Sequence, residues 1–112
     1  MSTRRTERLA EEIREDVARI VGQLKDPRIG FVTVTSVETS PDLRTAKVHV
    51  SVLGDEDQRE ATLEALRSSH GVLQSKIAAE TRMKRTPTLT FHFDPTVEQG
   101  MRISQLLGDD DG

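Results

Sequence analysis

Residues 56–82, EDQREATLEALRSSHGVLQSKIAAETR, decide the fold of this 112-residue chain. Apolar residues recur at helical spacing on both sides of the tripeptide Ser69-His70-Gly71, which interrupts the pattern. Serine and glycine are poor helix-interior residues, glycine by about 1 kcal/mol relative to alanine. The stretch therefore predicts two shorter helices, over about residues 56–68 and 71–82, that meet at a kink.

Signals for one helix and two strands precede this helix pair. Apolar side chains at steps of three and four predict an amphipathic helix over residues 3–24, ended by Pro27; its stripe is Leu9, Ile13, Val17, Ile20 and Leu24. Alternation of β-branched and polar residues predicts strands over 31–38 and 45–52. The turn signal Ser40-Pro41-Asp42 lies between the two strands.

A third strand and a last helix follow the pair. Apolar and polar residues alternate over 88–93, which predicts a strand with one apolar face. Asp94-Pro95 is a favourable N-cap and N1 pair for a short helix that continues to about residue 107. Residues 108–112, GDDDG, have nothing to bury and predict a disordered acidic tail.

The order of elements is thus α-β-β-α-kink-α-β-α, within a single α+β domain over residues 1–107. Each strand has one apolar face and each helix one apolar stripe, so we expect the helices to pack on one face of a mixed three-stranded sheet. A KH-like domain of type II, a fold that binds RNA, is built in this way. There the helices are usually joined by a GxxG loop that clamps the nucleic-acid backbone, and this sequence has no GxxG.

Composition excludes several classes of protein. The chain has no cysteine, which excludes disulfides, thiolate zinc sites and cysteine nucleophiles. It has no apolar run of about 18 residues, as a membrane span would need, and no apolar segment follows its basic N-terminus as in a secretory signal. We therefore expect a cytoplasmic protein.

The three histidines give no support to catalysis. His49, His70 and His92 have no acidic partner at the spacing of a catalytic triad or a metal site. The sequence predicts no catalytic residue, no metal ligand and no cofactor. If the outer faces of the second and third strands adjoin, His49 and His92 approach one another; an ordinary polar sheet face is the favoured interpretation of both.

Charge is distributed unevenly along the chain. The formal net charge is −3, yet residues 67–87 have a local balance of +4, from Arg67, Lys76, Arg82, Lys84 and Arg85 against Glu80. Acidic residues gather instead at 55–60 and 109–111. Such polarity is compatible with RNA binding in spite of the negative total.

An ordered series of short motifs resembles the ribosome-binding factor A family over about residues 4–107. The matching segments are Asp26-Pro27-Arg28-Ile29-Gly30, Ser40-Pro41-Asp42-Leu43, Ala46-Lys47-Val48-His49-Val50, Ser69-His70-Gly71 and Arg85-Thr86-Pro87-Thr88-Leu89-Thr90-Phe91. Each motif alone is weak, but their order and spacing are specific. Two positions depart from the family: Ser69 replaces its usual alanine, and Thr88 stands where glutamate is common.

The resemblance implies an assembly factor that has no enzymatic activity. Such a factor binds 16S ribosomal RNA on the immature small (30S) subunit and assists late maturation and processing of the precursor RNA. It supports growth in the cold, and its release is coupled to an assembly GTPase. We expect a monomer with the small subunit as its partner.

The predicted RNA-binding site is centred on the kink. Gly71 permits close approach of a phosphate to the backbone at a helix start, where Ser69, His70 and Lys76 would meet it. Further phosphate contacts are predicted from Arg82, Lys84, Arg85, Arg4, Arg5, Arg8 and Arg28. Each group also has a purely structural interpretation. The tripeptide 69–71 can be a simple interhelical turn, and the cations at 84–85 can be a solvated helix end. The arginines at the N-terminus can lie on an exposed helix face paired with Glu11 and Glu12, and Arg28 can brace its own turn.

Two alternatives from other classes remain open. A small α/β enzyme of the acylphosphatase kind needs a phosphate-cradling loop with an arginine and an asparagine, and this chain has no asparagine. A regulatory or structural module would pair through a strand edge and bind no RNA. Because electrostatic RNA binding weakens steeply with salt, a salt titration with small-subunit RNA separates that module from an RNA-binding protein.

Overall fold

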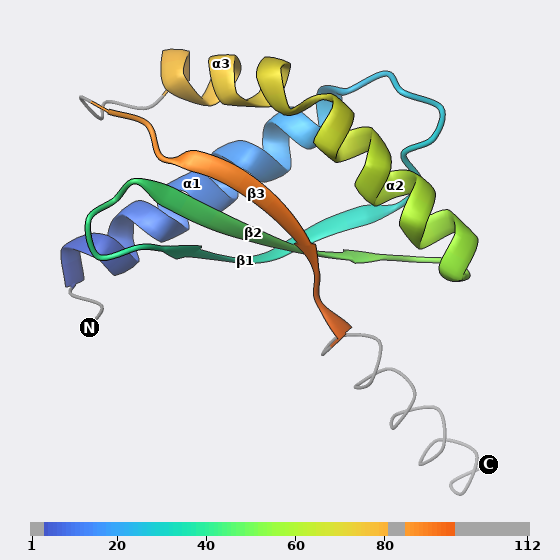
Figure 1. The fold of residues 1–112 in the computed structure, drawn as a ribbon, viewed down its shortest axis with the longest axis horizontal. Coiled ribbons are helices and arrows are strands. Elements are labelled where there is room, and N and C mark those ends of the chain that lie inside the picture. Colours follow the sequence, from blue (N-terminus) through green and yellow to red (C-terminus); the bar gives the residue numbers. More distant parts are fainter. Residues whose placement is uncertain (1–3, 81–84, 96–112) are drawn as a thin grey trace, which may run out of the picture.

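The computed structural model describes residues 4–80 and 85–95, which fold into a layer of helices and a layer of strands (Figure 1). Their elements follow the predicted order: α1 (Arg4–Gln23), β1 (Val32–Thr39), β2 (Thr45–Val52), α2 (Glu56–Ser68), α3 (His70–Glu80) and β3 (Thr88–Phe93). All six agree with the predicted ranges to within about two residues. The predicted last helix and the acidic tail lie outside the described residues.

The sheet is mixed, as expected, with the strand order β1-β2-β3. β1 pairs antiparallel with β2, and a bulge interrupts the ladder between Val34 and Ser36. β3 returns to the other side of β2 and pairs parallel with it, in a register that joins His49 to His92. A parallel neighbour needs a long crossover connection, which α2 and α3 supply.

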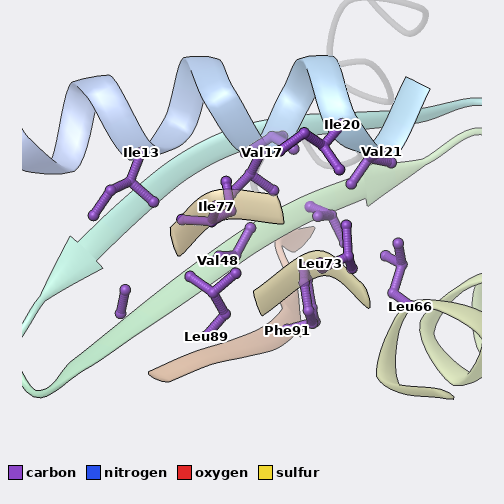
Figure 2. Packing of buried hydrophobic residues seen from close by; sticks show 13 residues of the cluster. Ile13, Val17, Ile20, Val21, Val48, Leu66, Leu73, Ile77, Leu89 and Phe91 are labelled. Carbon is purple, nitrogen blue, oxygen red and sulfur yellow. The ribbon is translucent and has the colours of Figure 1, made fainter. Parts of the chain in front are cut away.

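One face of the sheet forms the core with all three helices (Figure 2). Alternate strand residues point into it, and the helical stripe of α1 meets them through Ile13, Val17 and Ile20, all fully buried. The sheet contributes Val34, Ala46, Val48, Val50, Leu89 and Phe91, and the helix pair contributes Leu66, Leu73 and Ile77. On the opposite face Thr33, Lys47 and Thr90 are exposed. The prediction of helices on one face of the sheet is confirmed.

The loop that leads into β1 is fastened to α2 by one buried polar side chain. The Thr62 hydroxyl donates to the carbonyl of Arg28 and accepts from the amide of Gly30, both at 3.3 Å. Hydrogen bonding satisfies this buried hydroxyl, which would otherwise be costly to desolvate. The start of β1 is therefore held at a fixed position against the first turns of α2.

Candidate nucleic-acid interface

The α2–α3 joint, Ser69 to Gly71, turns the chain at a single residue. Ser69 is the C-cap of α2, with φ −89° and ψ 8°, and its amide donates to the carbonyl of Ala65 at 3.0 Å. Its own carbonyl accepts from the amide of Leu73, also at 3.0 Å. The two helices are thus joined by continued backbone hydrogen bonds through one residue in the bridge region of backbone conformation.

Gly71 does not supply the geometry of the kink, although the poor helix propensity of glycine was part of the reason to predict a kink in this tripeptide. Among the described glycines only Gly54 has a positive φ, and Gly71 lies inside α3. A Cβ built on Gly71 would meet nothing within 4 Å, whereas the unusual backbone angles belong to Ser69. The bridge region is open to ordinary residues, so the kink needs no glycine.

A groove runs beside the joint along the free edge of β3. We call it the β3 groove; its volume is about 430 Å³, and it is lined by Arg67, His70, Thr88, Leu89, Thr90, Phe91 and His92. His70 belongs to the joint, so the groove begins where the two helices meet. Backbone and side chains of an edge strand therefore border the predicted binding position.

Side chains from the helix pair occupy part of the β3 edge. The Gln74 amide accepts from Leu89 N at 2.9 Å and donates to the carbonyl of Pro87 at 2.7 Å, as a neighbouring strand would. Arg67 Nη2 donates to the carbonyl of Phe91 at 2.9 Å. Sequence reasoning missed both as site residues. Their spacing was the available signal, because Arg67, His70 and Gln74 at i, i+3 and i+7 share one helical face.

Two histidine rings meet on the open face of the sheet, next to this groove. The ring centroids of His49 and His92 are 5.8 Å apart, and the planes are tilted by 38°. The conditional expectation that the rings approach one another is therefore confirmed. His92 Nε2 lies 2.9 Å from Thr90 Oγ1. Partial burial, and then the nearby His49, Lys47 and Arg67, hold the pKa of His92 below its ordinary value, while Glu38 opposes the shift.

The other predicted residues lie on separate surfaces. Arg4, Arg5 and Arg8 are exposed on the first turns of α1, about 16 Å or more along the helix axis from Arg19, which pairs with Glu80 near the end of α3. Lys76 is exposed, but at 100° per residue it shares a face with Glu80 and lies on the other side of α3 from Gln74. The structure therefore does not bring these four cations to the β3 groove.

Arg28 is bound to a side chain of its own turn, which agrees with its structural interpretation. Its guanidinium donates to the Asp26 carboxylate through Nε at 3.2 Å and Nη2 at 2.8 Å, and its amide donates to the same group at 2.9 Å. These hydrogen bonds hold the pKa of Asp26 below its ordinary value. Arg28 thus braces its own turn. Arg85 is exposed between α3 and β3, while Arg82 and Lys84 lie outside the described residues.

A kinked helix pair beside the edge strand of a mixed three-stranded sheet is the arrangement of a KH-like domain. Comparison with known families gives the closer assignment, because the family model described as ribosome-binding factor A matches residues 5–107. The chain belongs to the ribosome-binding factor A family. A ribosome-binding factor A from Desulfitobacterium hafniense is 45% identical over 108 residues, which span 96% of this chain and 86% of that protein.

Solved structures agree with this assignment. The crystal structure of ribosome-binding factor A from Thermus thermophilus has a TM-score of 0.72 at 30% identity, over 79% of this chain and 93% of that one. A Thermotoga maritima protein solved in solution has a TM-score of 0.73 at 35% identity, over 82% and 89%. The Thermus factor fitted as a homology model into the cryo-EM map of its 30S complex has a TM-score of 0.69 at 29% identity, over 80% and 96%.

Of α1, α2 and α3, none is both long enough and apolar enough to cross a membrane. Likewise, no three histidine, aspartate or glutamate side chains in the described ranges, 4–80 and 85–95, form a group that could hold a metal ion.

Proposed function

We propose that this chain binds the small ribosomal subunit through 16S ribosomal RNA and acts there as a factor in late maturation and precursor processing. The observation that carries the proposal is the likeness, over 80% of the chain, to a factor that has been fitted into a 30S complex. Family membership supports the same function, since the family is named for ribosome binding.

The geometry of the joint supports RNA as the ligand. Open space above Gly71 lets a phosphate approach the backbone of α3 without meeting a side chain. From there the β3 groove leads past His70 to His92, two rings on which an unpaired base can stack. We therefore place a phosphate of the RNA over the joint and an unpaired base in the groove.

Electrostatics support contacts beyond the groove. Arg85 continues the basic segment 67–87 past the end of α3, and Arg4, Arg5 and Arg8 form a second cationic surface at the start of α1. Because these groups lie apart, we propose that they contact different stretches of RNA backbone, each adding to the salt dependence of binding.

The finer parts of the proposal concern how the factor works. We propose that it acts by binding and without catalysis, as a cytoplasmic monomer that needs no cofactor and that an assembly GTPase releases. Gln74 and Arg67 cover part of the β3 edge, which disfavours the pairing of two copies through that edge. This observation argues against a strand-pairing module that uses β3, and it does not bear on β1, the other edge strand of the sheet.

A salt titration tests the RNA contact. Lys84→Glu combined with Arg85→Glu should weaken binding to purified small subunits and flatten the salt slope by about two, because each lost phosphate contact removes about one unit. The control is Lys25→Glu with Arg44→Glu, which changes the net charge equally on exposed sites outside the segment 67–87 and outside the lining of the β3 groove. If both double variants match the unmodified protein at every salt concentration, the basic segment does not contact RNA.

Sedimentation of a cell lysate tests the partner. We expect the protein to co-migrate with free small subunits and to be depleted from complete ribosomes. Equal amounts in both fractions would contradict a role restricted to maturation.

A further inference from the structure

Two large apolar side chains stand in solvent at the end of the sheet where α2 begins. Phe31 is 80% exposed and Leu53 is 61% exposed, the two highest values among the large apolar residues that the structure describes. Phe31 precedes β1 and Leu53 follows β2, and the Leu53 amide donates to the Phe31 carbonyl at 3.0 Å. We call this pair the Phe31–Leu53 platform.

The backbone beside the platform packs against the Gln58 side chain of α2. The platform borders a hollow of about 380 Å³ that is also lined by Gly30, Gly54, Asp55 and Gln58. The Gln58 side chain fills the space beside both glycines: a Cβ would lie 2.6 Å from its Nε2 at Gly30 and 3.0 Å from its Cγ at Gly54. A surface held in place in this way loses little entropy when a partner binds.

The charges around the platform are negative. Asp55, Glu56, Asp57 and Glu60 are exposed at the start of α2. The nearby cations are engaged, since Arg28 is bound by Asp26 and the Arg59 guanidinium lies 4.2 Å from the centroid of the Phe93 ring. A phosphate backbone is repelled by such a surface, whereas a positively charged segment is attracted.

We infer that the Phe31–Leu53 platform docks an arginine- or lysine-rich polypeptide segment that carries an apolar side chain. In the subunit complex, on which this inference rests through the proposed function, that segment belongs to a protein component of the small subunit. The exposed face of Phe31 accepts a guanidinium by a cation–π contact, the carboxylates pair with further cations, and Leu53 packs against the apolar side chain. The factor would then contact RNA at the α2–α3 joint and protein at the start of α2.

Crosslinking tests which class of molecule lies at each surface. Because the chain has no cysteine, Leu53→Cys and Ser75→Cys each provide one attachment point for a photocrosslinker; Ser75 is exposed one helical turn from Gly71. In complexes with small subunits, the adduct at position 53 should survive nuclease treatment as a protein–protein adduct, whereas the adduct at position 75 should be lost on nuclease treatment. Nuclease-sensitive adducts at position 53 would overturn the inference in favour of RNA.

Affinity gives an independent readout. Phe31→Ser should weaken binding to intact small subunits by about tenfold, as for loss of one anchor residue, and change binding to protein-free 16S RNA by less than twofold. The matched control is Val72→Ser, at an apolar side chain that is 51% exposed beside the joint, which should change both affinities by the same factor. Unchanged melting temperatures would show that both variants fold.

The remaining outcomes are equally decisive. If Phe31→Ser binds intact subunits as tightly as the unmodified protein, the platform docks nothing there and the inference fails while the proposed function stands. If the unmodified protein binds neither subunits nor RNA, it is the proposed function that fails. Self-association that depends on concentration and disappears in Phe31→Ser would identify a second copy of the chain as the occupant and overturn the inference.

Discussion

The two ends of α2 both adjoin glycines, and the glycines are there for opposite reasons. At the start of the helix, Gly30 and Gly54 lie against Gln58, and Gly54 has a φ of +133°. Just past the end of the helix, Gly71 has ordinary backbone angles and nothing within 4 Å of the place where a Cβ would be. Gly54 is required by its backbone angle, and both glycines of this pair lie against Gln58, while Gly71 has neither constraint.

The two ends of α2 also differ in the charge of the surrounding surface and in the ligand that we propose for each. Around the start of α2 the exposed groups are carboxylates beside Phe31, and past its end the chain is basic and open at the backbone. Figure 1 shows α2 sloping from its junction with α3 down to the right-hand end of the sheet, where β2 ends. A closed, acidic region and an open, basic one suit different partners, so one short helix separates the proposed protein contact from the proposed RNA contact.

Gly54→Ala gives the largest expected effect and tests the closed region. The substitution forces an alanine into a positive φ and places its Cβ 3.0 Å from Gln58 Cγ. We expect a loss of about 1–3 kcal/mol in the free energy of unfolding, measured by chemical denaturation. The control is Gly22→Ala, at a site in α1 with nothing within 4 Å. A Gly54→Ala protein as stable as the control would remove the packing argument for this end.

Gly71→Ala is the matching test of the open region. Alanine is favoured over glycine in a helix by about 0.5–1 kcal/mol, so the free energy of unfolding should rise by that amount. Binding to small subunits should nevertheless weaken, because the new methyl group occupies the space in which we place a phosphate. Stability and affinity, measured on one preparation, should therefore change in opposite directions.

Gly22→Ala serves as the control here too, since it adds a methyl group to an exposed helical glycine elsewhere. It should gain similar stability without losing affinity. A Gly71→Ala protein that binds subunits as well as this control would show that the open space has no ligand.

A smaller effect concerns the histidine pair beside the β3 groove. Because the pKa of His92 is lowered in the folded state, the unfolded chain takes up the proton more readily, so stability should fall as pH drops from the ordinary histidine pKa toward the folded value. His92→Gln should remove this part of the decline between pH 7.5 and pH 5.5, followed by denaturation. An unaltered pH profile in the variant would contradict the assignment to His92.

The smallest effect is expected at the chain's end and tests whether local or total charge matters. Deleting residues 108–112 removes three aspartates and takes the net charge from −3 to about 0. The melting temperature should not change, and the affinity for an unrelated RNA should rise modestly at low salt. Identical binding curves for the two proteins would mean that the polarised folded domain, and not its total charge, governs RNA affinity.

Sequence patterns predicted the features that repeat along the chain. The apolar stripe that includes Ile13, Val17 and Ile20 correctly predicted α1. Alternation of apolar and polar residues correctly predicted three strands, and in the structure their register joins His49 to His92. The bend at Ser69 lies within the predicted tripeptide Ser69-His70-Gly71, although the pattern did not show which of the three residues forms it. Periodicity succeeds here because burial of one face imposes the repeat.

Features that depend on contacts between elements could not be predicted in this way. Helical spacing places Gln74 on the same face as Arg67 and His70, but only the packing of α3 beside β3 makes it a partner of Leu89 and Pro87. Phe31 was expected to begin a strand, whereas the strand begins at Val32 and leaves its ring in solvent. The sequence could have excluded Lys76 from the site, because helical geometry alone puts it about 140° around α3 from Gly71.

The parallel pairing of β2 with β3 has a consequence for the synthesis of this protein. The β1–β2 hairpin and α1 leave the ribosome first, but β3 pairs with β2 across the whole of α2 and α3. Until β3 emerges, one side of β2 has no neighbour, and Leu73 and Ile77 lack the strand side chains that complete their core. Pairing so distant in sequence closes late and slowly. The nascent chain therefore exposes an unpaired edge of β2 until β3 has been made.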